Sequence, residues 1–178
     1  MAHVQRERLT AEVEGDFVVF LIGMRINAVW KVHKWVPVFF AMPKMLQELS
    51  LQDDLGMLGY RTRWGGRNIE LIQYWSSFEK LHAYARTRDA EHLPAWADFN
   101  RRIADNGSVG IWHETYLVED GQYEAVYRNM PHYGLAAATT VVPAAGHRKT
   151  AAGRLGRSEG EDSPVDAAGH VDANPPEK

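Results

Sequence analysis

Two apolar stretches near the start of the chain have different periodicities and predict different elements. The first, "DFVVFLIGMRIN" (residues 16–27), is β-branched and aromatic and carries apolar side chains on both alternating faces. It predicts a central strand that is covered on both sides. The second, residues 34–51, repeats apolar residues at helical spacing: Trp35, Phe39, Met42, Leu46 and Leu49. This stripe is typical of an amphipathic helix.

The middle of the chain predicts a hairpin followed by two helices. "GYRTRWGGRNIELIQYW" (residues 59–75) contains two strand-like runs on either side of a Gly-Gly turn, a hairpin pattern. In "SSFEKLHAYARTRD", Ser76 stands three residues before Glu79, the spacing of a capping box at the start of a helix. A further helix is predicted over residues 92–107, with a proline near its start and Asn-Gly as its stop.

The segment "IWHETYLVEDGQYEAVYRNMP" (residues 111–131) predicts a second hairpin. Residues 109–118 form one expected strand and residues 123–129 the other, joined by the turn "EDGQ". An even loop length would set Glu114 opposite Tyr127 and His113 opposite Arg128. Alternation would also separate two sets of side chains onto opposite faces.

The order of these elements predicts the fold class. A strand, a helix, two strands, a helical region and a final hairpin match the α+β, ferredoxin-like split βαβ pattern, an antiparallel sheet with helices on one face. The first strand is apolar on both faces, so the face without helices also requires cover. A second copy of the chain could supply it, which predicts a homodimer.

Composition narrows the classes of function. The chain has 178 residues, 45% of them hydrophobic, and a net charge of -3, which favours one compact domain and no nucleic-acid partner. Cysteine is absent, which fits a reducing cytoplasm. The apolar runs fall short of the roughly 18 residues needed for a membrane span. We therefore expect a soluble, cytoplasmic protein without a membrane partner.

The composition changes near the C-terminus. Residues 134–178 contain no aromatic side chain and are rich in Ala, Gly, Pro and charge, so they offer little apolar surface to offset the cost of ordering the chain. We expect an N-terminal extension over residues 1–14, one domain over residues 15–140 and a tail over residues 141–178 that is mostly disordered from about Ala144.

Five segments, in this order, carry a resemblance over about residues 15–140: "GDFVVFLIGMRIN", "YWSSFEKLHAYAR", "HLPAW", "WHETY" and "YEAVYRNMPHYGLAA". The chain resembles a monooxygenase-like family of mostly uncharacterised proteins that includes an enzyme of fumagillin biosynthesis, within the dimeric alpha-beta barrel superfamily. The resemblance implies a homodimer whose sheets close into a barrel, with a pocket between sheet and helices in each subunit. Relatives include cofactor-free quinone-forming monooxygenases, haem proteins and proteins without known chemistry, so the resemblance leaves the reaction open.

Three residues of the predicted second hairpin are candidates for catalysis. His113 has a proton affinity near neutral pH and is a candidate base or ligand. Glu114 beside Tyr127 would make a proton-transfer pair. The alternative is that the hairpin only packs well.

Further residues are candidates for binding. Arg25 and Asn27 end the first strand and could bind a substrate carbonyl. Candidate pocket residues in the rest of the chain are Trp75, His92, Trp96 and Trp112. If haem is bound, His82, His92 and His113 are candidate axial ligands.

The leading hypothesis is a small oxidative enzyme that acts with O₂ on an apolar or aromatic metabolite and requires no flavin or nicotinamide. A base would remove a proton in an apolar pocket, and the resulting carbanion would react with oxygen. The second hypothesis is a haem protein of aldoxime-dehydratase or haem-degrading type. The third is a non-catalytic dimeric binding protein. The chain contains no HExxH, phosphate-loop or Gly-x-Ser-x-Gly motif, which removes most support for hydrolase and nucleotide-binding functions.

Overall fold

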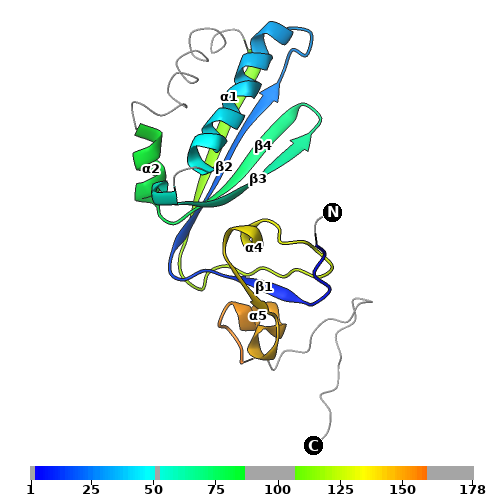
Figure 1. The fold of residues 1–178 in the computed structure, drawn as a ribbon, viewed down its shortest axis with the longest axis vertical. Coiled ribbons are helices and arrows are strands. Elements are labelled where there is room, and N and C mark those ends of the chain that lie inside the picture. Colours follow the sequence, from blue (N-terminus) through cyan, green and yellow to red (C-terminus); the bar gives the residue numbers. More distant parts are fainter. Residues whose placement is uncertain (1–2, 51–52, 87–106, 160–178) are drawn as a thin grey trace, which may run out of the picture. The chain divides into compact units, whose positions relative to one another are not determined.

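The computed structural model describes residues 3–50, 53–86 and 107–159, and these fall into two compact units. The sheet unit comprises Phe17–Leu117, and the terminal unit comprises Met1–Asp16 together with Val118–Lys178. Each unit contains its own sheet (Figure 1). The chain begins in the terminal unit, passes through the sheet unit and returns to the terminal unit.

The sheet unit has the predicted split βαβ arrangement. Its described elements, in chain order, are β2 (Phe17–Ile26), α1 (Val32–Ser50), the 3-10 helix η1 (Asp53–Leu55), β3 (Met57–Gly65), β4 (Asn68–Trp75), α2 (Phe78–Arg86) and β5 (Val109–Val118). The four strands lie in the order β3-β4-β2-β5, so β4 is inserted between the two strands that α1 connects. The predicted α+β, ferredoxin-like class is confirmed.

Strand register decides which side chains meet the helices. β2 and β4 are antiparallel, with Val18 opposite Trp75 and Phe20 opposite Gln73. Val18 and Trp75 form a buried cluster with Leu49 of α1 and with Leu81 and Tyr84 of α2. The face that carries Val18, Phe20 and Trp75 is therefore the helix-covered face, and burial of each large apolar side chain there is worth roughly 1.5 to 3 kcal/mol.

The N-terminal cap of α2 is formed by Ser77, one residue later than the predicted Ser76. The hydroxyl of Ser77 accepts a hydrogen bond of 3.2 Å from the backbone N–H of Lys80. A capping side chain must come directly before the first helical residue to reach that amide, and α2 begins at Phe78. Hydrogen bonds from the backbone and from Ser77 lower the pKa of Glu79.

The predicted second hairpin is only half correct. Residues 109–118 form β5 and residues 119–122 make a turn, in which the N–H of Gln122 donates to the carbonyl of Glu119. Residues 123–129 form no second strand against β5. Instead, Tyr127 and Leu9 exchange two backbone hydrogen bonds of 2.8 and 2.9 Å. A distant segment of the chain satisfies these backbone groups, which local strand patterns do not reveal.

The terminal unit joins the two ends of the described chain. The strand β1 (Leu9–Glu12) pairs antiparallel with β6 (Thr140–Pro143). The remaining elements of this unit are α4 (Leu135–Ala138), the 3-10 helix η2 (Gly146–Lys149) and α5 (Ala151–Arg154). The expected N-terminal extension therefore contributes a strand to this unit.

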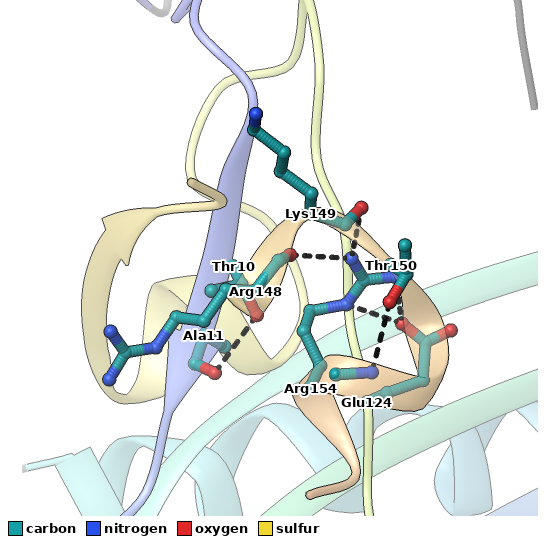
Figure 2. A network of polar contacts seen from close by, with 8 residues as sticks. Thr10, Ala11, Glu124, Arg148, Lys149, Thr150 and Arg154 are labelled. Carbon is teal, nitrogen blue, oxygen red and sulfur yellow. Dashed lines mark hydrogen bonds and ion pairs between the residues drawn. The ribbon is translucent and has the colours of Figure 1, made fainter. Parts of the chain in front are cut away.

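Residues 141–159 are structured, which differs from the predicted disordered tail. Only 5% of the Arg154 side chain is exposed. Its Nε and Nη2 donate to one Glu124 oxygen at 2.9 and 2.6 Å, and its Nη1 donates to the carbonyls of Arg148 and Lys149 (Figure 2). Polar contacts to a buried guanidinium hold this segment, and a prediction from missing aromatic residues overlooks them. Residues 160–178 lie outside the described part of the chain.

Two other sequence predictions concern a helix over residues 92–107 and the absence of a membrane span. The helix predicted over residues 92–107 lies outside the described residues, apart from Gly107, which has a positive φ of 62°. Where helices are described, none is long and apolar enough to cross a membrane.

Candidate functional site

The sheet unit encloses a cavity of about 120 Å³ between its sheet and its helices. Strands β2 and β4 supply one wall, and α1 and α2 supply the other. The lining residues are Phe20, Ile22, Leu46, Leu49, Leu71, Gln73, Trp75, Leu81, Tyr84 and Ala85. An apolar cavity with very few polar groups is typical of a site for a small organic ligand.

Trp75 and Gln73 give this cavity its chemical character. Both side chains point to the same face because they are two residues apart on β4. Trp75 is fully buried and Gln73 is 6% exposed. The indole N–H of Trp75 donates a hydrogen bond of 2.9 Å to Oε1 of Gln73, and its ring lies 5.8 Å from that of Tyr84. Trp75, a predicted pocket wall, therefore lines the cavity.

Gln73 was not among the residues singled out from the sequence, although a signal was present. In "NIELIQYW" the helix-covered positions are Ile69, Leu71, Gln73 and Trp75. A single amide on an otherwise apolar strand face departs from the local pattern, and such departures tend to mark functional sites.

His113 is on the same side of the sheet as the cavity. Its ring centroid lies 5.8 Å from that of Phe20, which lines the cavity, while His113 itself is exposed. The histidine is thus separated from the cavity by one aromatic side chain. The imidazole itself faces solvent, beside the Phe20 wall of the cavity.

Glu114 lies on the opposite face of β5 and is paired with Tyr116. The phenol of Tyr116 donates a hydrogen bond of 2.6 Å to the Glu114 carboxylate. This hydrogen bond and the nearby negative charge raise the pKa of Tyr116. The predicted strand pairing that would set Tyr127 opposite Glu114 is wrong, since the backbone of Tyr127 pairs with Leu9. The hydroxyl of Tyr127 accepts a hydrogen bond from the N–H of Ala136.

Three other predicted binding residues, Arg25, Asn27 and Trp112, do not line this cavity. Arg25 donates to the Asn68 side chain at 3.1 Å, and Asn27 donates to the carbonyl of Gly107 at 3.0 Å. The indole of Trp112 packs so closely on Gly23 that a Cβ there would lie 2.7 Å from it. A substrate-binding role for these three residues stays a prediction.

The two candidate haem ligands that the structure describes, His82 and His113, lie on different elements. His82 is an exposed residue of α2 whose ring stacks on Phe78 at 5.7 Å, and neither His82 nor His113 lines the cavity. His92 and Trp96 lie outside the described residues. Among the residues that are described, no group of three or more metal-binding side chains could hold a metal ion.

The terminal unit contains a second cavity, of about 310 Å³, with a mixed polar lining. The ion pair of Arg148 with Glu12 and that of Arg154 with Glu124 lie in its walls. Because each arginine is already paired with a carboxylate, neither guanidinium is dedicated to an anionic ligand.

The fold and the cavity define a ferredoxin-like α+β protein with space for a small apolar ligand between sheet and helices. The chain belongs to the Monooxygenase af470-like family, whose model matches residues 17–135. Membership of the family predicted from the sequence segments is thereby confirmed.

A curated relative supports the same family. Monooxygenase af470 of Aspergillus fumigatus is 32% identical over 152 residues, which cover 72% of this chain and 53% of that protein. The chain thus spans about half the length of the curated relative it matches. Family members are named as monooxygenases.

Solved structures with a similar fold have little sequence in common with the chain. SnoaB, a cofactor-independent oxygenase from Streptomyces nogalater, is 10% identical, with a TM-score of 0.42 over 57% of this chain and 91% of that one. A conserved protein from Methanosarcina mazei Go1 is also 10% identical, with a TM-score of 0.41 over 56% of this chain and 91% of its own.

Proposed function

We propose that the protein is a small oxidative enzyme that inserts oxygen from O₂ into an apolar or aromatic metabolite bound in the cavity between sheet and helices. The observation that carries this proposal is the cavity itself, because aromatic rings of Phe20, Trp75 and Tyr84 surround a single buried amide. Membership of a family named for monooxygenases supports the reaction type. No flavin or nicotinamide is required in this proposal.

The proposed reaction uses the substrate as its own reductant. In this proposal His113 removes a proton from an acidic C–H of the substrate. The apolar walls exclude water from the reacting groups. The carbanion reacts with O₂ to form a hydroperoxide, which loses water and leaves a C=O group. One O₂ thus converts a CH₂ group into C=O and one water. Glu114 lies on the other strand face, so the proposal assigns it no step.

Oxygen uptake tests this function. Purified protein is incubated with aryl ketones such as 1-indanone and 1-tetralone in an oxygen electrode, and products are analysed by mass spectrometry. We expect oxygen uptake and products that have gained one oxygen and lost two hydrogens. Binding of these ketones without oxygen uptake would instead support the non-catalytic binding protein.

An absorption spectrum tests the haem alternative. Protein purified from haem-supplemented cells is expected to show no Soret band. A Soret band that shifts or disappears in His82→Ala or His113→Ala would contradict the cofactor-free proposal and identify an axial ligand.

We also propose a homodimer in which the helix-free faces of two sheets meet. Phe17, Val19 and Leu21 alternate with the helix-covered residues of β2, and Val19 and Leu21 remain half-buried in the single chain. Covering such a face with a second copy removes apolar surface from water. Light scattering at micromolar concentration should give twice the chain mass, and a monomer would contradict the proposal. The cytoplasmic location expected from the sequence stays a prediction.

A further inference from the structure

One polar side chain stands among the walls of the cavity in the sheet unit. Nine of the ten lining residues are aliphatic or aromatic, and the tenth is Gln73. Only 6% of Gln73 is exposed, although glutamine is rarely this buried. An amide in this position calls for a physical reason, because burying it is unfavourable unless its hydrogen bonds are made.

The hydrogen bond from Trp75 fixes which end of the amide is which. An indole N–H can only donate, so the Gln73 atom 2.9 Å from Trp75 Nε1 is the carbonyl oxygen Oε1. The other end of the amide is therefore the Nε2 group, with two N–H donors. Because Trp75 is fully buried and packed against Tyr84, the amide is held in this orientation before any ligand binds.

The Nε2 group has no protein acceptor within the described part of the chain: the one side-chain hydrogen bond of Gln73 is to Trp75. Among the described residues, this nitrogen is not one of the fully buried atoms without a partner, so part of its surface is open, and Gln73 lines the cavity. A bound molecule with an acceptor oxygen would complete the hydrogen bonds of this amide. A pure hydrocarbon would leave them unmade.

We propose that Gln73 is a specificity-determining residue that donates a hydrogen bond to a carbonyl, enolate or phenolate oxygen of the ligand. This inference rests on the proposed function in that both place the ligand in the same cavity. It also deepens the chemistry, since removal of a proton next to a carbonyl moves negative charge onto that oxygen. A fixed N–H donor at that point stabilises the charge as it develops. Gln73 selects planar apolar molecules that carry an acceptor oxygen.

A matched pair of ligands tests this selection. Indane and 1-indanone share one bicyclic skeleton and differ by a carbonyl oxygen. Calorimetric titration without oxygen should show that the wild-type protein binds 1-indanone about tenfold more tightly than indane, the ratio expected for one hydrogen bond in an apolar site. Gln73→Leu should bring the two affinities within about twofold by removing this bond and should keep the affinity for indane. Gln73→Met provides a second variant of similar shape, and the exposed Gln122→Leu serves as the control that keeps the preference.

Three outcomes would overturn the inference. The first is equal binding of the two ligands by the wild-type protein. The second is a preference for 1-indanone that survives in both Gln73 variants. The third is binding of neither ligand. Failure of the proposed function gives a different result: if the ketone preference depends on Gln73 but no oxygen is consumed, the binding role stands and the oxidative role falls.

Discussion

The ring of His113 on β5 lies 5.8 Å from the ring of Phe20 on β2, on the face of the sheet that α1 and α2 cover. Phe20 is also a wall of the cavity and stands opposite Gln73 in the strand register. An exposed, titratable ring thus borders an apolar cavity that contains one amide donor. The Phe20 ring thus lies between the proposed base and the cavity that contains the proposed hydrogen-bond donor.

Replacement of His113 tests its role as a base. His113→Ala should lower turnover of a ketone substrate by roughly a hundredfold, because general-base catalysis contributes about that much or more. His113→Gln should keep the packing against Phe20 and lose the activity. The exposed His33 of α1 provides the control, and His33→Ala should leave turnover unchanged. Equal turnover in all three variants, with only a lower melting temperature for the His113 variants, would assign His113 to packing.

Gly23 of β2 tests the close contact between β2 and β5. A Cβ at this position would lie 2.7 to 2.9 Å from atoms of the Trp112 indole. Gly23→Ala should therefore destabilise the fold by about 1 to 3 kcal/mol, the usual cost of overpacking. Gly65→Ala is the matched control, since nothing lies within 4 Å of its added Cβ. Urea denaturation that shows equal stability for both variants would contradict the contact.

Tyr116 should lose its phenolic proton at a higher pH than an ordinary tyrosine, because its phenol donates to Glu114. The raised pKa of Tyr116 means that the folded protein favours the protonated phenol. The stabilising effect is therefore complete below the ordinary tyrosine pKa and is lost as the pH rises through the raised folded value. Ultraviolet titration should show one phenolate signal that appears at a higher pH than the others, and Tyr116→Phe should remove this signal. Glu114→Gln should move this signal to lower pH, while Glu119→Gln should not. An unmoved signal in Glu114→Gln would contradict the pairing.

Two truncations test the packing of the C-terminal segment. Ending the chain after residue 145 removes Arg148 and Arg154 and leaves Glu12 and Glu124 without their partners. Ending it after residue 159 keeps both ion pairs. We expect the shorter chain to unfold at a lower temperature and to be cleaved faster by trypsin within residues 3–16. The chain that ends after residue 159 should behave as the full chain, which would agree with a tail that does not contribute to folding.

A point variant isolates the Arg154 contact within this segment. Glu124→Gln removes the charge that compensates the buried guanidinium, but Glu124 is 36% exposed. Water screens part of the interaction between the two charges. A destabilisation of about 1 to 2 kcal/mol is therefore expected rather than the full cost of breaking a buried pair. Differential scanning calorimetry that shows no change would mean that the carbonyl contacts alone hold Arg154.

Local sequence patterns determined the elements of the sheet unit. The apolar alternation of residues 16–27 predicts β2, the helical stripe from Trp35 to Leu49 predicts α1, and the Gly-Gly turn predicts the β3–β4 hairpin. These patterns are readable because side-chain periodicity follows directly from backbone geometry. Their order then allowed only a few topologies, and the split βαβ arrangement is one of them.

Only the tertiary structure decided the long-range pairings and the set of residues that line the cavity. Tyr127 pairs with Leu9 rather than with β5, and Arg154 finds Glu124, because backbone and charged groups are satisfied by partners that lie far away in the sequence. The sequence shows Gln73 as a lone amide on an apolar strand face, but only the tertiary structure shows that Trp75 donates to its oxygen. The sequence by itself determines which face a side chain takes, whereas three-dimensional packing determines what that side chain meets.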